Sequence, residues 1–222
     1  MYLSRVEIDI NNRQKTKELT HLGAYHNWVE QGFPNEIADH KRLRHLWRID
    51  RLAGKTYLLV LSQEAPNLDQ LGAYGVEKTA MTKSYDPFLD QVKEGQIMQF
   101  RLTANPTHAI SQPGKNQPRI VPHVTVNQQR QWLAERAAKL GFQVVKTATA
   151  GLMDSEEIEN FDIVSRDWPI LKRGHRTIRL SRVTYEGLLR VDDLDTFKQT
   201  LMNGIGREKA FGMGLMTVIP RG

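Results

Sequence analysis

The 222-residue sequence predicts an α+β fold made of two tandem ferredoxin-like domains, each with the element order β-α-β-β-α-β. Three observations indicate this fold. Apolar residues alternate with period two in several short segments, which is typical of strands, and follow three- and four-residue spacing in others, which is typical of helices. The order of these patterns restarts after a turn-like segment around Pro87. We therefore expect an N-terminal domain at 1–84, a linker at 85–95 and a C-terminal domain at 96–222.

The first half begins with a predicted strand at 3–10, in which apolar and charged side chains alternate. The apolar spacing then changes to three and four residues between 16 and 31. This spacing predicts a helix that Gly32 and Pro34 end. The remaining elements of this half are predicted as strands at 46–51, 55–62 and 75–85, with a short helix at 67–71.

The second half begins with a predicted strand at 96–104, in which Met98, Phe100 and Leu102 share one face. Three prolines and many polar residues predict a long loop at 105–123. A helix begins at Asn127 and ends at Gly141, which has the chemistry of a C-cap. The remaining elements are strands at 142–149, 183–191 and 215–219 and a helix at 195–202. We expect four tryptophans to be wholly or partly buried, namely Trp28, Trp47, Trp132 and Trp168.

The composition excludes several classes of protein. There is no cysteine, which excludes disulfides and thiolate metal sites. No apolar run approaches the length of a membrane helix, and the N-terminus alternates instead of forming the apolar block of a signal peptide. We therefore expect a soluble cytoplasmic protein with no membrane partner.

Basic residues are concentrated in one short segment. The chain has 31 Lys and Arg against 25 Asp and Glu, a formal net charge of +6. Five of the basic residues lie within 171–182, which contains no acidic residue; they are Lys172, Arg173, Arg176, Arg179 and Arg182. This pattern predicts a phosphate-binding surface. The alternative is a solvated hairpin whose charges keep an edge strand soluble. Arg101, on the strand at 96–104, is a further candidate for phosphate contact, with an ordinary outward-facing arginine as its alternative.

A glycine-rich segment, NGIGREKAFGMGL, precedes the last predicted strand and contains Gly204, Gly206, Gly212 and Gly214 together with Arg207 and Lys209. Glycines allow backbone N–H groups to approach a phosphate closely, and Lys209 adds a positive charge. A Walker loop runs from strand to helix and follows its lysine with Ser or Thr. Here the order is helix, loop, strand, and Ala210 follows the lysine, which disfavours a nucleotide triphosphatase. A flexible connection between helix and strand remains an alternative.

His26 is the candidate acid or base. Its unperturbed pKa near neutrality suits proton transfer, although a histidine on an apolar helix face is also typical of a packed core residue. The other histidines do not predict a metal site. His21 and His26 are five residues apart, as are His40 and His45, so each pair diverges on a helix. With no HExxH motif or acidic ligand cluster, we expect neither a metal nor another cofactor.

Four segments together resemble the CasE family of endoribonucleases, which belongs to the RAMP group. They are MYLSRVEI at the start, His26 ahead of the Phe33-Pro34 pair, QFRLTANPT at 99–107 and GIGREKAFGMGL at 204–215. The resemblance covers the whole chain. It implies a tandem ferredoxin-like protein that binds the stem-loop of the CRISPR repeat transcript and cuts it without metal at the 3′ base of the stem. It also implies that the protein stays bound to the product as a subunit of the type I-E Cascade complex.

The resemblance also implies roles for residues. The family's catalytic histidine lies on the first helix, where this chain has His26. Some members carry a tyrosine one turn earlier; this chain has Gly23 there and Tyr25 nearby, so Tyr25 is a candidate catalytic residue. The family's glycine-rich loop shapes the RNA-binding cleft. Its counterparts here are Gly204, Gly206, Lys209, Gly212 and Gly214.

RNA can be cut without a metal because the ribose 2′-OH is a tethered nucleophile. His26 would move a proton, and Lys209 with loop N–H groups would stabilise the oxyanion, leaving a 5′-hydroxyl and a 2′,3′-cyclic phosphate. Whether His26 acts as acid or base stays open. The account requires His26 and the glycine-rich segment to face each other across one cleft. The alternative function is a non-catalytic RNA hairpin-binding subunit; a small-molecule enzyme on this fold is disfavoured because no cofactor motif is present.

Overall fold

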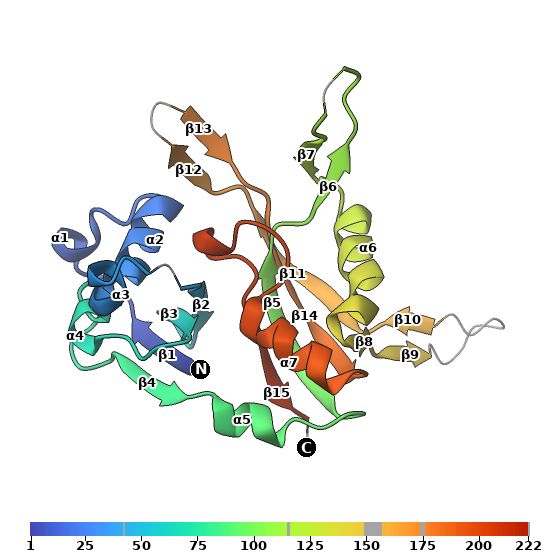
Figure 1. Cartoon of the computed structure of the whole chain (residues 1–222), viewed down its shortest axis with the longest axis horizontal. Helices are drawn as coiled ribbons and strands as arrows, with labels where there is room; N and C mark the ends of the chain where they lie inside the picture. Colours follow the sequence, from blue (N-terminus) through green and yellow to red (C-terminus); the bar gives the residue numbers. More distant parts are fainter. Residues whose placement is uncertain (42, 115, 149–156, 174–175, 222) are drawn as a thin grey trace.

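The computed structural model describes the chain except for residues 42, 115, 149–156, 174–175 and 222. Two antiparallel sheets lie side by side, and helices pack against each of them (Figure 1). This arrangement confirms the predicted α+β class with two ferredoxin-like units. The division into 1–84, 85–95 and 96–222 stays a prediction, although the segment expected to be a linker contains a helix, α5 (Asp86–Gln91).

The first sheet has the strand order β2-β3-β1-β4, which is the 4-1-3-2 order of a ferredoxin-like unit. Val6 pairs with Leu58 across β1 and β3, and both side chains are fully buried against the helical layer. The strands are β1 (Tyr2–Glu7), β2 (Leu46–Leu52), β3 (Lys55–Ser62) and β4 (Met81–Ser84). The helices are α1 (Arg13–Thr16), α2 (Leu22–Gln31), α3 (Pro34–Ala38) and α4 (Leu68–Leu71).

Two predicted elements of the first half are shorter than expected. The helix predicted at 16–31 begins only at Leu22, as α2, because the preceding short helix α1 ends at Thr16. The strand predicted at 75–85 is regular only over β4, from Met81. Gly75 instead lies so close to β1 that a Cβ there would be 2.2 Å from Cγ2 of Val6. The apolar pattern alone did not reveal this close packing.

The second sheet has the order β11-β14-β5-β15, and a further short strand, β8, also pairs with β14. Its strands are β5 (Ile97–Ala104), β8 (Phe142–Val144), β11 (Phe161–Asp167), β14 (Arg182–Val191) and β15 (Met216–Pro220). The helices are α6 (Val126–Ala137), continued by η1 (Ala138–Leu140), and α7 (Leu194–Asn203). Thr125 and Gln128 form a capping box at the start of α6, and Gly141 ends η1 with a left-handed φ of 80°.

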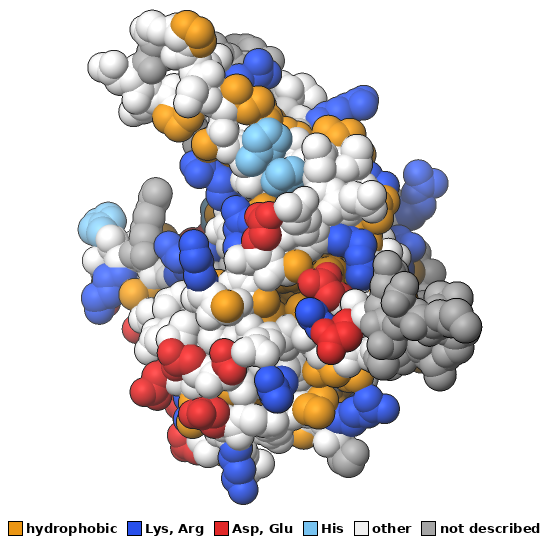
Figure 2. Space-filling view, turned by 90° about the vertical axis from the view of Figure 1, so that its right-hand side faces the viewer, with side chains coloured by type: hydrophobic (Ala, Val, Ile, Leu, Met, Phe, Trp, Pro, Cys, Tyr) orange, Lys and Arg blue, Asp and Glu red, His pale blue; other side chains and the backbone are white. Residues whose placement is uncertain are grey.

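Three hairpins extend from this half. The prediction of a long loop at 105–123 is wrong, because the segment contains the hairpin of β6 (Thr107–Ile110) and β7 (Arg119–Pro122). Figure 2 shows this hairpin projecting at the top of the molecule, where Ile110 and Ile120 are exposed. The other hairpins pair β9 (Lys146–Ala148) with β10 (Glu157–Glu159) and β12 (Ile170–Arg173) with β13 (Arg176–Arg179). β11, whose pairing with β14 is interrupted by a bulge, was not predicted.

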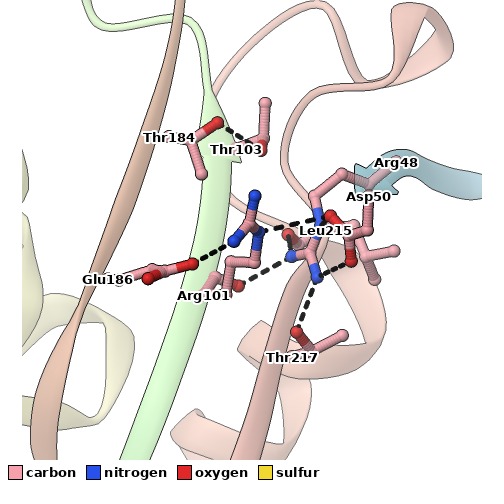
Figure 3. Close-up of polar contacts among 8 residues, drawn as sticks. All are labelled: Arg48, Asp50, Arg101, Thr103, Thr184, Glu186, Leu215 and Thr217. Atoms are coloured by element: carbon pink, nitrogen blue, oxygen red, sulfur yellow. Dashed lines mark hydrogen bonds and ion pairs between the residues drawn. The ribbon is translucent and has the colours of Figure 1, made fainter. Parts of the chain in front are cut away.

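A buried arginine joins the two sheets (Figure 3). Arg48 on β2 is 2% exposed and forms a bidentate ion pair with Asp50, with N···O distances of 2.7 and 2.8 Å. Its guanidinium also donates to three oxygens of the second sheet: the carbonyl of Arg101 at 2.8 Å, that of Leu215 at 3.1 Å and Oγ1 of Thr217 at 2.8 Å. A buried charge is tolerated when it is paired and its donors are satisfied, and Arg48 meets both conditions.

Candidate active site

The helix α2 carries His26 at the boundary between core and solvent. Leu22, Trp28 and Val29 face the core of the first half, and the indole N–H of Trp28 donates to the carbonyl of Leu71 at 3.0 Å. These contacts set the rotation of the helix. His26 consequently lies at the edge of the buried face, with 35% of its side chain exposed. It is therefore not a core histidine.

His26 and the glycine-rich segment face each other, as the cleavage mechanism predicted from the sequence requires. Both line one cleft of about 1170 Å³, which we call the histidine cleft. Its walls are α2, α3, residues 40, 41 and 43–45, and the segment 206–210. The His26 ring meets the ring of Phe211, in η2 (Lys209–Phe211), edge to face at 5.6 Å. His26, whose side chain is suited to proton transfer, therefore shares the histidine cleft with the glycine-rich segment.

Glu30 lies beside His26, and His45 and Glu36 continue this chain of contacts. Nδ1 of His26 lies 3.7 Å from Oε1 of Glu30, one helical turn further along α2. The same oxygen lies 2.9 Å from Nδ1 of His45, whose Nε2 lies 3.2 Å from Oε1 of Glu36. Burial opposes a charge on His45, but its hydrogen bonds and ion pairs with Glu30 and Glu36 raise its pKa above the ordinary value.

Basic residues line the opposite wall of the histidine cleft. Nζ of Lys209 donates to the carbonyl of Asn203 at 2.8 Å, which holds the ammonium beside the first residue of the glycine-rich segment. Partial burial and the nearby charge of Arg44 lower the pKa of Lys209. Arg44 and Arg207 line the same cleft and are exposed. Lys41 also lines this cleft, so four cationic side chains share it with His26.

Tyr25, by contrast, is not in the histidine cleft. It lines a second cleft of about 1140 Å³ between the two sheets, which we call the junction cleft. Its ring stacks on Trp47 with a centroid distance of 6.0 Å. Burial raises the pKa of its hydroxyl, and the charge of Arg182 opposes that rise. The structure therefore does not bring Tyr25 together with His26 and Lys209.

The four glycines of the loop differ in position. Only Gly206 lines the histidine cleft, and Gly212 borders the junction cleft. Gly212 has φ of 76°, and a Cβ there would be 2.6 Å from Cζ3 of Trp47. Trp47 in turn donates from its indole N–H to the carbonyl of Ala210 at 3.0 Å. Gly204 and Gly214 are similarly enclosed, by Leu46 and by the backbone of Ile205. Gly204 and Gly212 therefore allow the loop to pack on Leu46 and Trp47 of β2.

The predicted basic segment forms the β12–β13 hairpin. Arg179 is exposed on β13. Arg182 forms an ion pair with Asp167, so part of its charge is already compensated. Lys172, Arg173 and Arg176 belong to the two strands, but their side chains lie outside the described part of the structure. The base of the hairpin packs into the core around α2 through Leu171 and Leu180, which are 5% and 8% exposed.

Arg101 belongs to the junction between the sheets. Its Nε lies 3.2 Å from Oδ1 of Asp50, and its guanidinium also pairs with Glu186 on β14 (Figure 3). About a third of the side chain is exposed in the junction cleft. Its charge is therefore already partnered by two carboxylates. Trp168, which was expected to be buried at least in part, is 41% exposed at the same cleft.

Sequence reasoning missed Glu30, Glu36, Arg44 and His45. Glu30 had a readable signal, because the spacing i to i+4 on a helix places it beside His26. His45 had none, since it lies just before β2 and reaches α2 only through the fold. In the described residues, no group of three or more His, Asp and Glu side chains is arranged to hold a metal ion. No helix in this described part is long and apolar enough to cross a membrane.

Comparisons with known proteins show which family and which solved structures this chain resembles. The family model described as "CRISPR associated protein" matches residues 1–220. The CRISPR-associated endoribonuclease Cse3 of Thermus thermophilus is 27% identical over 222 residues, covering 99% of this chain and 100% of Cse3. A structure of CRISPR endoribonuclease Cse3 bound to 19 nt RNA has a TM-score of 0.78 at 25% identity, covering 99% of this chain and 100% of that one. A chain of a CRISPR RNA-guided surveillance complex shares the fold, with a TM-score of 0.61 at 18% identity and 100% coverage of both chains.

Proposed function

The chain belongs to the CRISPR-associated protein family, and we propose that it is an endoribonuclease that binds the stem-loop of a CRISPR repeat transcript. It cuts at the 3′ base of the stem without a metal and stays bound to the mature guide RNA. The observation that carries this proposal is the histidine cleft, which His26 lines together with Lys41, Arg44, Arg207 and Lys209. A proton-transfer group and positive charges are the two requirements of cleavage by an RNA 2′-OH.

The reaction follows from the chemistry of RNA. The 2′-oxygen forms a bond to the adjacent phosphorus as its proton leaves, and the bond from phosphorus to the 5′-oxygen breaks as that oxygen gains a proton. His26 performs one of these two proton transfers through Nε2, because Nδ1 faces Glu30. Lys209, Arg44 and Arg207 stabilise the charge that develops on the phosphoryl oxygens. The products are a 2′,3′-cyclic phosphate and a 5′-hydroxyl.

Binding of the stem is assigned to the β12–β13 hairpin. Proteins recognise an A-form stem mainly through its shape and its phosphates, because side chains cannot read its deep, narrow major groove. The hairpin includes most of the segment 171–182, which has five Lys and Arg and no acidic residue, and it packs against the core that supports α2. An RNA stem held by the hairpin would thus lie beside the helix that bears His26. Arg101 and Tyr25, which line the junction cleft, are proposed as further contacts to RNA.

We also propose that the protein is a subunit of an RNA-guided surveillance complex of the Cascade type, where it holds the 3′ hairpin of the guide. The shared fold with a chain of such a complex supports this assignment. We propose a cytoplasmic location, because its substrate is a transcript and the sequence contains no cysteine.

The test is cleavage of a repeat stem-loop RNA in the presence of a chelator. Wild-type protein should cut once and leave a cyclic phosphate. His26→Ala should bind the RNA with unchanged affinity while its cleavage rate falls by about 10²–10⁴-fold. His108→Ala, on the β6–β7 hairpin, is the matched control and should cut normally. Wild-type protein that binds the RNA tightly but leaves it intact would instead support the non-catalytic hairpin-binding subunit.

A further inference from the structure

We propose that His45 is a positioning residue: it holds Glu30 against Nδ1 of His26 and thereby fixes the ring that cleavage uses. This inference rests on the proposed endoribonuclease function. The observation that carries it is an alternating chain of side chains, His26, Glu30, His45 and Glu36, with contacts of 3.7, 2.9 and 3.2 Å. One oxygen, Oε1 of Glu30, faces both histidine rings.

The contacts of His45 require a particular protonation pattern. Both of its ring nitrogens face carboxylate oxygens. A neutral imidazole has only one N–H donor, and an ionised carboxylate only accepts, so both contacts are satisfied together when the ring is protonated. Glu30 and Glu36 also raise the pKa of His45 against the opposing effect of burial. The protonated ring then attracts the two carboxylates from opposite sides.

His45 is fixed more firmly than the residue it holds. Its side chain is 1% exposed, and its ring stacks on Phe33 at 3.8 Å with an interplanar angle of 8°. Glu36 is 4% exposed and accepts from the backbone N–H of Leu43 at 3.2 Å. Glu30 is 35% exposed at the edge of the cleft. A buried and doubly bonded ring therefore restrains a carboxylate that borders solvent.

The position of Glu30 determines the state of His26. An ionised carboxylate at Nδ1 favours a proton on that nitrogen and leaves Nε2 to exchange protons with RNA. Other charged or titratable side chains line the same cleft and remain unchanged in the variants below; they are His40, Lys41, Arg44, Arg207, Glu208 and Lys209.

The experiment compares three variants with the wild-type protein. His45→Phe keeps the stack on Phe33 and removes both donors, His45→Gln keeps an N–H donor for Glu30, and Glu30→Gln removes the carboxylate. The readouts are the tautomer of the His26 ring, from its imidazole ¹⁵N NMR signals without RNA, the single-turnover cleavage rate and the affinity for RNA. We expect His45→Phe and Glu30→Gln to reduce the fraction of His26 rings that carry the proton on Nδ1. We expect His45→Phe to slow cleavage about 10-fold or more at unchanged affinity, and His45→Gln to restore much of the rate.

Several outcomes would overturn the inference. One is a folded His45→Phe protein in which the His26 tautomer and the cleavage rate equal those of wild type. Another is a slower variant whose His26 tautomer is unchanged, because that result indicates a purely structural role. If His45→Phe fails to fold, His45→Gln and Glu30→Gln decide the question through the same NMR measurement. If wild-type protein does not cleave RNA, the proposed function fails, whereas the NMR measurement still tests the contact between Glu30 and His26.

Discussion

His26 shows how far a single residue can be interpreted from sequence. Its place on a helix was predictable, and its position opposite the glycine-rich segment is confirmed by the shared cleft. Its support from His45 was not predictable, because 19 positions separate the two residues and only the fold of α3 and β2 closes that distance. The assignment of catalytic roles to His26, Tyr25 and Lys209 stays a prediction.

His45 makes stability depend on pH. Its pKa is raised in the folded state, so its contribution is fully present below the unfolded pKa of about 6.5 and is lost as pH rises through the folded pKa. We expect the free energy of unfolding, measured with urea at several pH values, to fall over that range. The fall should be smaller in Glu36→Gln, which removes one of the two carboxylates. Asp39→Asn, at an exposed neighbouring site, should leave the pH dependence unchanged.

At the scale of elements, periodicity predicted most of the strands and helices of both sheets. It failed where short-range packing decided the structure. The segment 105–123 forms a hairpin despite its prolines, and β11 escaped detection because a bulge interrupts its alternation. The four glycines of the C-terminal loop were visible as a group. The contacts of Gly204 with Leu46 and of Gly212 with Trp47 were not predictable, because more than 150 residues separate the two members of each pair.

Gly212→Ala tests the packing of this loop on β2. The φ of 76° and the 2.6 Å approach to Trp47 should both be unfavourable, with a combined loss of about 2–4 kcal/mol in the free energy of unfolding. Gly54→Ala is the matched control, because Gly54 also has φ of 76° but has no atom within 4 Å of the added Cβ. It should lose only about 1 kcal/mol. Equal losses in the two variants would show that contact with Trp47 contributes nothing.

Arg179→Gln tests the β12–β13 hairpin as an RNA-binding element. If Arg179 contacts one phosphate, the slope of log Kd against log salt should decrease by about 0.7–0.9, and binding should weaken. Arg190→Gln removes the same charge from an exposed position on β14 that faces Gln143. Its salt slope should equal that of wild type. The same decrease in both variants would indicate a general effect of net charge instead of a contact by the hairpin.

At the scale of the whole molecule, the two halves form one structure through β2. This strand contributes Arg48 and Trp47 to contacts with the second half, and it continues the segment that contains His45. The predicted pair of domains is confirmed as a pair of folds. Their mutual packing was not predictable, since it depends on a buried arginine that looked like any other residue of an alternating strand.

Arg48→Met tests this junction. The substitution leaves Asp50 without its bidentate partner and leaves acceptors of the second sheet without a donor, so we expect a loss of about 3–5 kcal/mol in the free energy of unfolding. Arg51→Met, at an exposed position on the same strand, should change stability by less than about 0.5 kcal/mol. Urea denaturation measures both. Similar small losses would show that Arg48 does not join the halves.

The core beneath α2 has a consequence for biosynthesis. Leu171, Leu180 and Met213, from the second half, complete a cluster that otherwise consists of residues from the first 80 positions. A nascent polypeptide emerging from the ribosome therefore exposes an unfinished apolar surface beneath α2 until Met213 has been translated. We expect co-translational folding of the first half to stay incomplete up to that point.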